Sequence, residues 1–428
     1  MDDMKSQFPR IVKVRQRIST AVLSDLSRAL NQEMDQMPIP AMGLKGKRIG
    51  ISVGSRGIDR CSQLLLSLCD RIKAWGGQPV IIPAMGSHGG GTEAGQLEVL
   101  EGLGITQKTM GAPIRACAQS TKLGETPEGY PLFCNRAALD MDHLILFNRI
   151  KKHTDFTGNI ESGLHKIMTI GLGGPTGATH VHRLVLKEGY EKVIVSIARA
   201  MLEKLPVLFG VGVVENAVGH VNQIEVILPE ALHSREAALL VQAKALDIKL
   251  PFHHANVLVV GEVGKDISGG GMEGSKVGRI RMIGQAEPTS PQIDRIVALS
   301  LTPATHGNAT GLGLADITTR RVFDAVDLKK TALNCLISMG PEHAAIPCVT
   351  SSDREAIYWA LGTVGLEDPA KTAKLAYIQN TKKLETLAVS EPLLKDFVDH
   401  GGIEVMSEPE PMQFDAKGNF LNFKYAVV

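Results

Sequence analysis

The sequence predicts an α/β fold of two α/β domains with mostly parallel sheets and a ligand site in the cleft between them. The chain has 428 residues and a hydrophobic content of 44%, which is more than one ordinary domain needs. Short apolar runs alternate with helix-patterned segments, as they do in β-α-β units. Glycine-rich loops follow these runs in both halves, and parallel sheets bind ligands at that end of their strands.

The first predicted domain covers residues 1–240. It begins with an amphipathic helix within residues 10–35, where Val14, Ile18 and Val22 have helical spacing. An apolar run at 47–53, a helical pattern at 61–75 and a second run at 79–83 form a β-α-β unit, which implies a parallel sheet. Further strands are expected at 113–116, 143–147 and 207–214, and further helices at 92–103 and 182–202.

The second predicted domain covers residues 250–428 and follows a polar, helix-patterned connection at 229–246. Its strand at 255–261 is followed by GEVGKDISGGGMEGSK, and its strand at 293–301 by THGNATGLGLADITTRR. Two halves with such loops would enclose a ligand between them.

Composition narrows the partners and the compartment. The 46 basic and 45 acidic residues create no field that would hold nucleic acid or an anionic membrane, so we expect a small-molecule ligand. No segment has about 20 consecutive apolar residues, and the N-terminus lacks the apolar core of a signal peptide, so we expect a cytoplasmic protein. The six cysteines show no zinc-type spacing and are expected to be reduced and structural.

Two histidines follow predicted strands. His88 stands in the loop GSHGGGT, where glycines let the backbone approach a ligand, although a loop that cradles phosphate would need the same glycines. His153 lies just past the strand at 143–147. Their positions make both histidines candidates for catalysis.

The segment 148–183 contains four histidines and three lysines, and His180, His182 and Lys166 are further candidates. His180 and His182 could both bind a metal from an extended segment, but from a helix they would point to different sides, so at most one is expected to be a ligand. Lys166 has apolar neighbours; it would either reach the surface or, if buried near positive charge, become a nucleophile. Asp155 and Glu161 could support the site, although solvated loop acids are commoner.

Five motifs resemble the nickel-dependent lactate racemase family in order and approximate spacing. They are GSR at 54–56, MGSHGG at 85–90, NRIKKHTDFTG at 148–158, ESGLHK at 161–166 and GATHVH at 177–182. The resemblance covers the first predicted domain closely and most of the second with weaker motifs.

The resemblance implies a racemase or epimerase of a 2-hydroxy acid that acts by reversible hydride transfer to a nickel-pincer nucleotide. In this cofactor, a pyridinium mononucleotide, two sulfur-bearing arms and a ring carbon hold nickel in a square plane. The resemblance makes His88 and His153 the two catalytic bases and His182 the protein's nickel ligand. Two bases suit inversion, because the hydroxyl proton must be taken from either of two positions, and histidine can do this near neutral pH.

The resemblance also implies the residues that hold the cofactor and the substrate. Lys166 would anchor the cofactor covalently. Arg56 would bind the substrate carboxylate bidentately. The other residues expected at the cofactor or the substrate are Ser55, Gly89, Gly90, Lys265 and Arg320. Proteins that synthesise the cofactor are expected partners, and a homo-oligomer is compatible with the sequence.

Departures from the family pattern concern the substrate. Val53 stands where the best-known members have aspartate, and SGGGM at 268–272 follows Lys265-Asp266-Ile267 where they have Tyr, Gln and Lys. The loss of bulk and charge predicts a pocket for a 2-hydroxy acid larger than lactate. Side chains that could serve it are Lys276, Asp316, Thr318, Thr319 and Arg321. Alternatively, Arg320 and Arg321 cap a helix and face water.

Two other functions fit the same residues. One is a hydrolase in which His88, His153 and His182 bind zinc. The other is a carrier or binding protein that uses the pocket without turnover.

Overall fold

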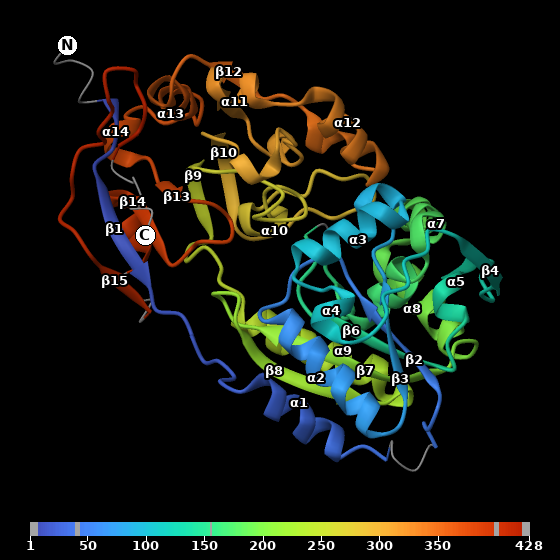
Figure 1. Ribbon diagram of the computed structural model, residues 1–428. Coiled ribbons are helices and arrows are strands. Elements are labelled where there is room, and N and C mark those ends of the chain that lie inside the picture. Colours follow the sequence, from blue (N-terminus) through green and yellow to red (C-terminus); the bar gives the residue numbers. More distant parts are fainter. Residues whose placement is uncertain (1–6, 39–42, 155, 398–401, 422–428) are drawn as a thin grey trace. The chain divides into compact units, whose positions relative to one another are not determined.

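The computed structural model of the chain describes residues 7–38, 43–154, 156–397 and 402–421 (Figure 1). It divides into an N-terminal unit, Ser19–Asp247, and a C-terminal unit, Met1–Ile18 with Ile248–Val428. Each unit contains a sheet of mostly parallel strands with helices, which confirms the α/β class. In the described ranges, no helix is both long and apolar enough to cross a membrane.

The sheet of the N-terminal unit has five strands in the order β3-β2-β6-β7-β8. The first four run parallel, and β8 returns antiparallel beside β7. Ile49 and Ile51 of the central strand β2 are fully buried. The strands are β2 (Arg48–Val53), β3 (Gln78–Pro83), β6 (His143–Arg149), β7 (Val207–Glu215) and β8 (Val221–Ile227).

Two helices cover one face of this sheet: α1 (Leu26–Asp35) and α2 (Cys61–Ala74) lie side by side (Figure 1), and their buried leucines share a core with β2. A separate hairpin of β4 (Ser120–Glu125) and β5 (Pro131–Asn135) was not expected from the sequence. The remaining helices are α3 (Glu93–Gly102), α4 (Gln107–Met110), α5 (Arg136–Leu139), α6 (Leu164–Lys166), α7 (Gly174–Glu188), α8 (Tyr190–Leu202) and α9 (Leu232–Leu246).

The sheet of the C-terminal unit has the order β12-β11-β10-β9-β13-β14-β1-β15. The strands from β12 to β13 are parallel, and β14, β1 and β15 alternate in direction. The strands are β1 (Ile11–Gln16), β9 (His254–Val260), β10 (Gln292–Ala298), β11 (Ile317–Thr319), β12 (Cys348–Thr350), β13 (Leu375–Ile378), β14 (Thr386–Ser390) and β15 (Ile403–Val405). The helices are α10 (Gly274–Val277), α11 (Arg320–Ala325), α12 (Leu328–Ile337), α13 (Asp353–Gly362), α14 (Pro369–Thr372) and α15 (Glu391–Leu394).

The helix predicted within residues 10–35 is wrong in its first half. Ile11–Gln16 is strand β1, which pairs with β14, and only Leu26–Asp35 is helical. The Asp25 side chain caps that helix by accepting from the Arg28 N–H at 2.9 Å. Because β1 joins the C-terminal unit, residues before Ser19 group with that unit and not with the first predicted domain.

Two other predicted elements differ from the structure. Residues 113–116 form only an isolated bridge, Ile114 with Ile81, and no strand. The helix expected at 182–202 is two helices, α7 and α8, because Gly189 between them has a φ of +81°, which ends the first.

Gly95 of α3 should be intolerant of any side chain. A Cβ built on Gly95 would lie 2.0 Å from the Gly89 carbonyl oxygen, whereas one built on Gly102, in the same helix, meets no atom within 4 Å. We expect Gly95→Ala to destabilise the protein by about 1–3 kcal/mol through overpacking. Gly102→Ala should stabilise it by roughly 0.5–1 kcal/mol. Urea unfolding of the two variants measures the difference, and equal stabilities would contradict this packing.

Candidate active site

Three of the expected site residues follow the carboxyl ends of neighbouring parallel strands. Arg56 follows β2, His88 follows β3 and His153 follows β6, and β2 pairs with both of the others. Parallel strands end at the same edge of a sheet, so the structure brings these three loops to one edge. The two loops that the sequence singled out after its first strands both lie there.

Lys166 and His182 come to this edge on a broken helical segment. A π-helical turn, Ile167–Gly171, follows α6 directly and precedes α7. Such turns are rare and often mark functional sites. The Gly86 N–H, in the loop that carries His88, donates to the Gly171 carbonyl at 3.2 Å, which ties the loop to the π turn. A Cβ on Gly171 would lie 2.6 Å from the Ala84 carbonyl oxygen, so this approach requires glycine.

His153 is buried, with 7% of its surface exposed. Its ring lies 4.4 Å from the Phe156 ring and 5.6 Å from the Tyr190 ring, measured between centroids. The Lys166 ammonium, which can only donate, binds His153 Nε2. Burial, followed by the positive charge of Lys166, lowers the pKa of His153 well below 6.5. The imidazole is therefore neutral at pH 7, with the lone pair of Nε2 directed at Lys166.

His182 presents a buried ring nitrogen without a partner. Its Nδ1 has no hydrogen bond in the described part of the chain. Burial, and then the charges of Lys166 and His88, lower its pKa to about 4, so the ring is neutral at physiological pH. His180, two residues earlier in α7, instead stacks on Phe133 with 5.0 Å between ring centroids. The two histidines thus have different surroundings, as the helical alternative required.

His88 is exposed and lies in the turn after β3. Its Nδ1 is 3.0 Å from the Met85 carbonyl oxygen. A carbonyl can only accept, so in the neutral ring Nδ1 carries the proton and Nε2 is the basic atom.

Arg56 has no hydrogen-bond or ion-pair partner among the residues that the structure describes. Although its side chain is exposed, partial desolvation of its guanidinium, together with the nearby Arg149, lowers its pKa. The group remains charged at any physiological pH. The nearby Arg149, by contrast, forms an ion pair with Glu215. Arg56 is therefore placed to bind an anion.

Two side chains of helix α9 contact the segment that carries His153 and Lys166. The sequence alone did not predict these contacts. The buried Glu161 carboxylate accepts from the His153 N–H at 2.6 Å and pairs with Lys244 of α9 at 2.6 Å. Glu236 of α9 binds His165. Glu161 is thus a buried supporting carboxylate and not a solvated loop acid. Asp155, the other acid considered, lies outside the described residues.

Two predicted substrate residues lie in the C-terminal unit. Lys265 Nζ donates to the Gly269 carbonyl at 2.5 Å. Arg320 is at the start of α11 with 66% of its side chain exposed, and it pairs with Asp324 at 2.8 Å. This position agrees with the alternative prediction that Arg320 lies at a helix end and faces water.

The other polar residues predicted to serve a larger substrate make contacts within the C-terminal unit. Asp316 pairs with Arg279 at 2.6 Å, Thr318 donates to the Ala298 carbonyl, and Thr319 caps α11. Arg321 binds Asp353 and the Leu299 carbonyl, and Lys276 is buried, 3.8 Å from Glu273. Each of these side chains therefore already has a partner within the C-terminal unit.

The glycines of 268–272 are likewise explained by packing. A Cβ on Gly271 would lie 1.7 Å from the Thr310 carbonyl oxygen, and one on Gly311 would lie 1.9 Å from the Gly270 carbonyl oxygen. Met272 has only 1% of its surface exposed. The stretch is a closely packed turn, so its glycines do not by themselves make room for a larger substrate.

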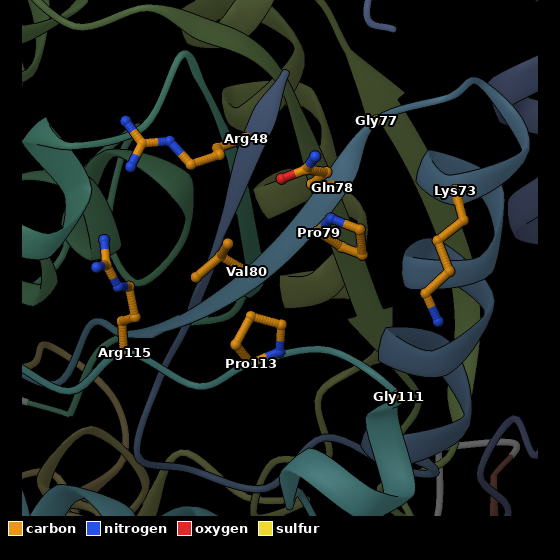
Figure 2. A pocket seen from close by; sticks show the side chains of 9 residues that line it. All are labelled: Arg48, Lys73, Gly77, Gln78, Pro79, Val80, Gly111, Pro113 and Arg115. Atoms are coloured by element: carbon orange, nitrogen blue, oxygen red, sulfur yellow. The ribbon is translucent and has the colours of Figure 1, made fainter. Parts of the chain in front are cut away.

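A hollow of about 400 Å³ lies at the opposite edge of the N-terminal sheet (Figure 2). It is lined by the amino ends of β2 and β3, with Arg48, Lys73 and Arg115 around it. The exposed carboxylates of Asp70 and Asp140 lie 3.4 and 3.5 Å from Lys73 and Arg115, respectively, and offset two of these charges. None of the candidate site residues lines it.

The three-histidine zinc site that the sequence left open is not assembled. In the part of the chain that the structure describes, no three His, Cys, Asp or Glu side chains are grouped so that they could hold a metal ion. His153 Nε2 faces Lys166, and His88 Nδ1 faces a carbonyl. A metal that needs only one protein ligand would not require such a group.

Comparisons with known proteins agree with the motifs. Residues 5–193 match the sequence model of the lactate racemase N-terminal domain. The fold resembles the lactate racemase apoprotein from Thermoanaerobacterium thermosaccharolyticum, with a TM-score of 0.56 and 13% identity over 87% of this chain and 99% of that one. It also resembles a protein from Thermotoga maritima, with a TM-score of 0.50 and 14% identity over 84% of this chain and 96% of that one. No match is found among curated proteins. Residues 5–193, which include all five motifs, therefore match the lactate racemase N-terminal domain.

Proposed function

We propose that this protein is a racemase or epimerase of a 2-hydroxy acid that works with a nickel-pincer nucleotide. The observation that carries the proposal is the buried Nδ1 of His182 on α7, which has no hydrogen-bond partner in the described part of the chain. His182 is also close enough to Lys166 and His88 for their positive charges to lower its pKa. The match of residues 5–193 to the lactate racemase N-terminal domain supports the isomerase class. The cytoplasm and the cofactor-synthesis proteins remain the expected compartment and partners.

The residues of the N-terminal unit fit such a cofactor. A neutral imidazole is a good nickel ligand, and the low pKa of His182 keeps its ring neutral. A buried polar atom without a partner is costly, which suits a group that acquires one when a ligand binds. The Lys166 amine would attach the nucleotide. When bound, the cofactor would accept the substrate hydride and return it.

The protein's own residues would handle the proton and the carboxylate. His88 offers Nε2 as a base, because its Nδ1 proton is held by the Met85 carbonyl. His153 offers Nε2 once Lys166 no longer donates to it. Arg56, charged and without a described partner, would hold the substrate carboxylate.

Replacing His182 with alanine should abolish nickel retention while the protein stays folded. The protein is co-expressed with cofactor-synthesis genes, and metal content and intact mass are measured after purification. His180→Ala, in the same helix, is the matched control and should retain nickel, because His180 packs on Phe133. Equal retention by the two variants would show that His182 is not the ligand.

Turnover separates the racemase from a binding protein. Cofactor-loaded protein is incubated with each enantiomer of a panel of 2-hydroxy acids that includes lactate, and inversion is followed by chiral chromatography. Retained cofactor without inversion of any member of the panel would favour a carrier.

A further inference from the structure

Glu236, on α9, makes two contacts with the start of the helical segment that carries Lys166. Its Oε2 accepts from the His165 N–H at 2.9 Å and lies 2.6 Å from His165 Nδ1. Both side chains are buried, with 1% and 3% of their surfaces exposed. The two residues are 71 positions apart in sequence, so the contact is tertiary.

The contact supplies what α6 lacks locally. The residue before the helix is Gly163, which has no side chain to cap the first N–H groups. A carboxylate beside these groups satisfies one of them and interacts favourably with the positive end of the helix. Glu236 therefore acts as the cap, supplied from another helix.

The second oxygen of Glu236, Oε1, lies close to Gly163 and has no hydrogen-bond partner in the described part of the chain. A Cβ on Gly163 would lie 2.0 Å from Glu236 Oε1. The Gly163 carbonyl in turn accepts from Asn148 Nδ2, on β6, at 2.8 Å. The carboxylate is thus wedged against the turn immediately before Lys166.

We propose that Glu236 is a positioning residue that orients the turn Gly163–Lys166 so that the Lys166 ammonium meets His153 Nε2. Glu236 is attached to both the backbone and the ring of His165. Two attachments restrict rotation of this turn more than a single hydrogen bond would. Lys166 is the next residue, so its direction follows from that of His165. The proposal rests on the proposed roles of Lys166 and His153.

The test uses the full-length, cofactor-free protein with ¹⁵N-labelled histidine. NMR of the ring nitrogens reads whether His153 Nε2 accepts a hydrogen bond, and His153→Ala assigns its signals. The wild-type signature should be lost in Glu236→Ala and in Gly163→Ala, which displaces the carboxylate without changing any charge. Glu225→Gln, which removes a carboxylate that binds Arg235, the neighbour of Glu236 on α9, is the matched control and should keep the signature.

A second pair of variants decides the matter if Glu236→Ala does not fold. The side-chain amide of asparagine can replace the His165 Nδ1–H donor, so His165→Asn should keep the His153 signature and His165→Leu should lose it. A wild-type signature in folded Glu236→Ala, equal spectra of the two His165 variants, or no hydrogen-bond signature in the wild type would overturn the proposal. These spectra need no substrate, so a failed racemase assay beside the expected spectra would overturn only the proposed function.

Discussion

Replacing His153 with alanine is expected to lower kcat/KM for racemisation by roughly 10²- to 10⁴-fold, the usual cost of removing a general base. The His153 ring is buried and neutral, and Nε2 is the ring nitrogen that faces Lys166. The Glu161 carboxylate holds the backbone N–H of His153 in place. His88→Ala should have an effect of similar size. Rates measured separately from each enantiomer of the substrate would test both variants.

The control for this prediction lies on β6, the strand that precedes His153. His143 begins β6, at the end opposite to His153, and lies at the other edge of the sheet. His143→Ala should leave kcat/KM within a few-fold of the wild type. Near-normal racemisation by His153→Ala or His88→Ala would remove that residue from the mechanism.

Arg56→Ala is expected to reduce kcat/KM by roughly 10- to 150-fold, because a hydrogen bond to a charged group contributes about 1.5–3 kcal/mol. Lysine should restore little of this, since an ammonium cannot reproduce the two parallel bonds of a guanidinium to a carboxylate. Steady-state kinetics with the best substrate of the panel gives the measurement.

Arg48 offers a matched control for Arg56. It is the first residue of β2, at the opposite edge of the sheet from Arg56, and it is likewise exposed, with its backbone N–H donating to Asp142 at 2.7 Å. Arg48→Ala should leave kinetics unchanged. If both variants lose activity equally, the effect comes from the charge of the whole protein and not from a bound carboxylate.

Local pattern predicted the N-terminal sheet well. The runs that became β2, β3, β6 and β7 are apolar because both faces of these strands are covered, and loops after them hold Arg56, His88 and His153. The prediction of a helix at residues 11–16 was wrong because Val14 fits a helical spacing and a strand alternation equally well. Only pairing with β14, far along the chain, decides between them.

The buried carboxylates that hold the candidate site in place could not be predicted from the sequence, because their contacts also depend on residues far along the chain. Glu161 looks like any loop acid until Lys244 is brought to it, and Glu236 carries no local signal of its contact with His165. Conversely, the glycines of 269–271 suggested open space, whereas Gly271 is needed because its backbone approaches that of Thr310 closely. Sequence spacing identifies residues that could meet, and tertiary packing determines which of them do.

The place of β1 has a consequence for synthesis on the ribosome. All the strands of the N-terminal sheet come from Arg48 to Ile227, so that unit can fold while the rest of the chain is still being made. β1 cannot, because its neighbours are β14 and β15. At about 5–20 residues per second, the strand waits roughly 20 to 75 seconds after emerging before β14 is complete. During that interval Ile11, Val12 and Val14, which end almost fully buried, have no strand partner to cover them on the nascent chain.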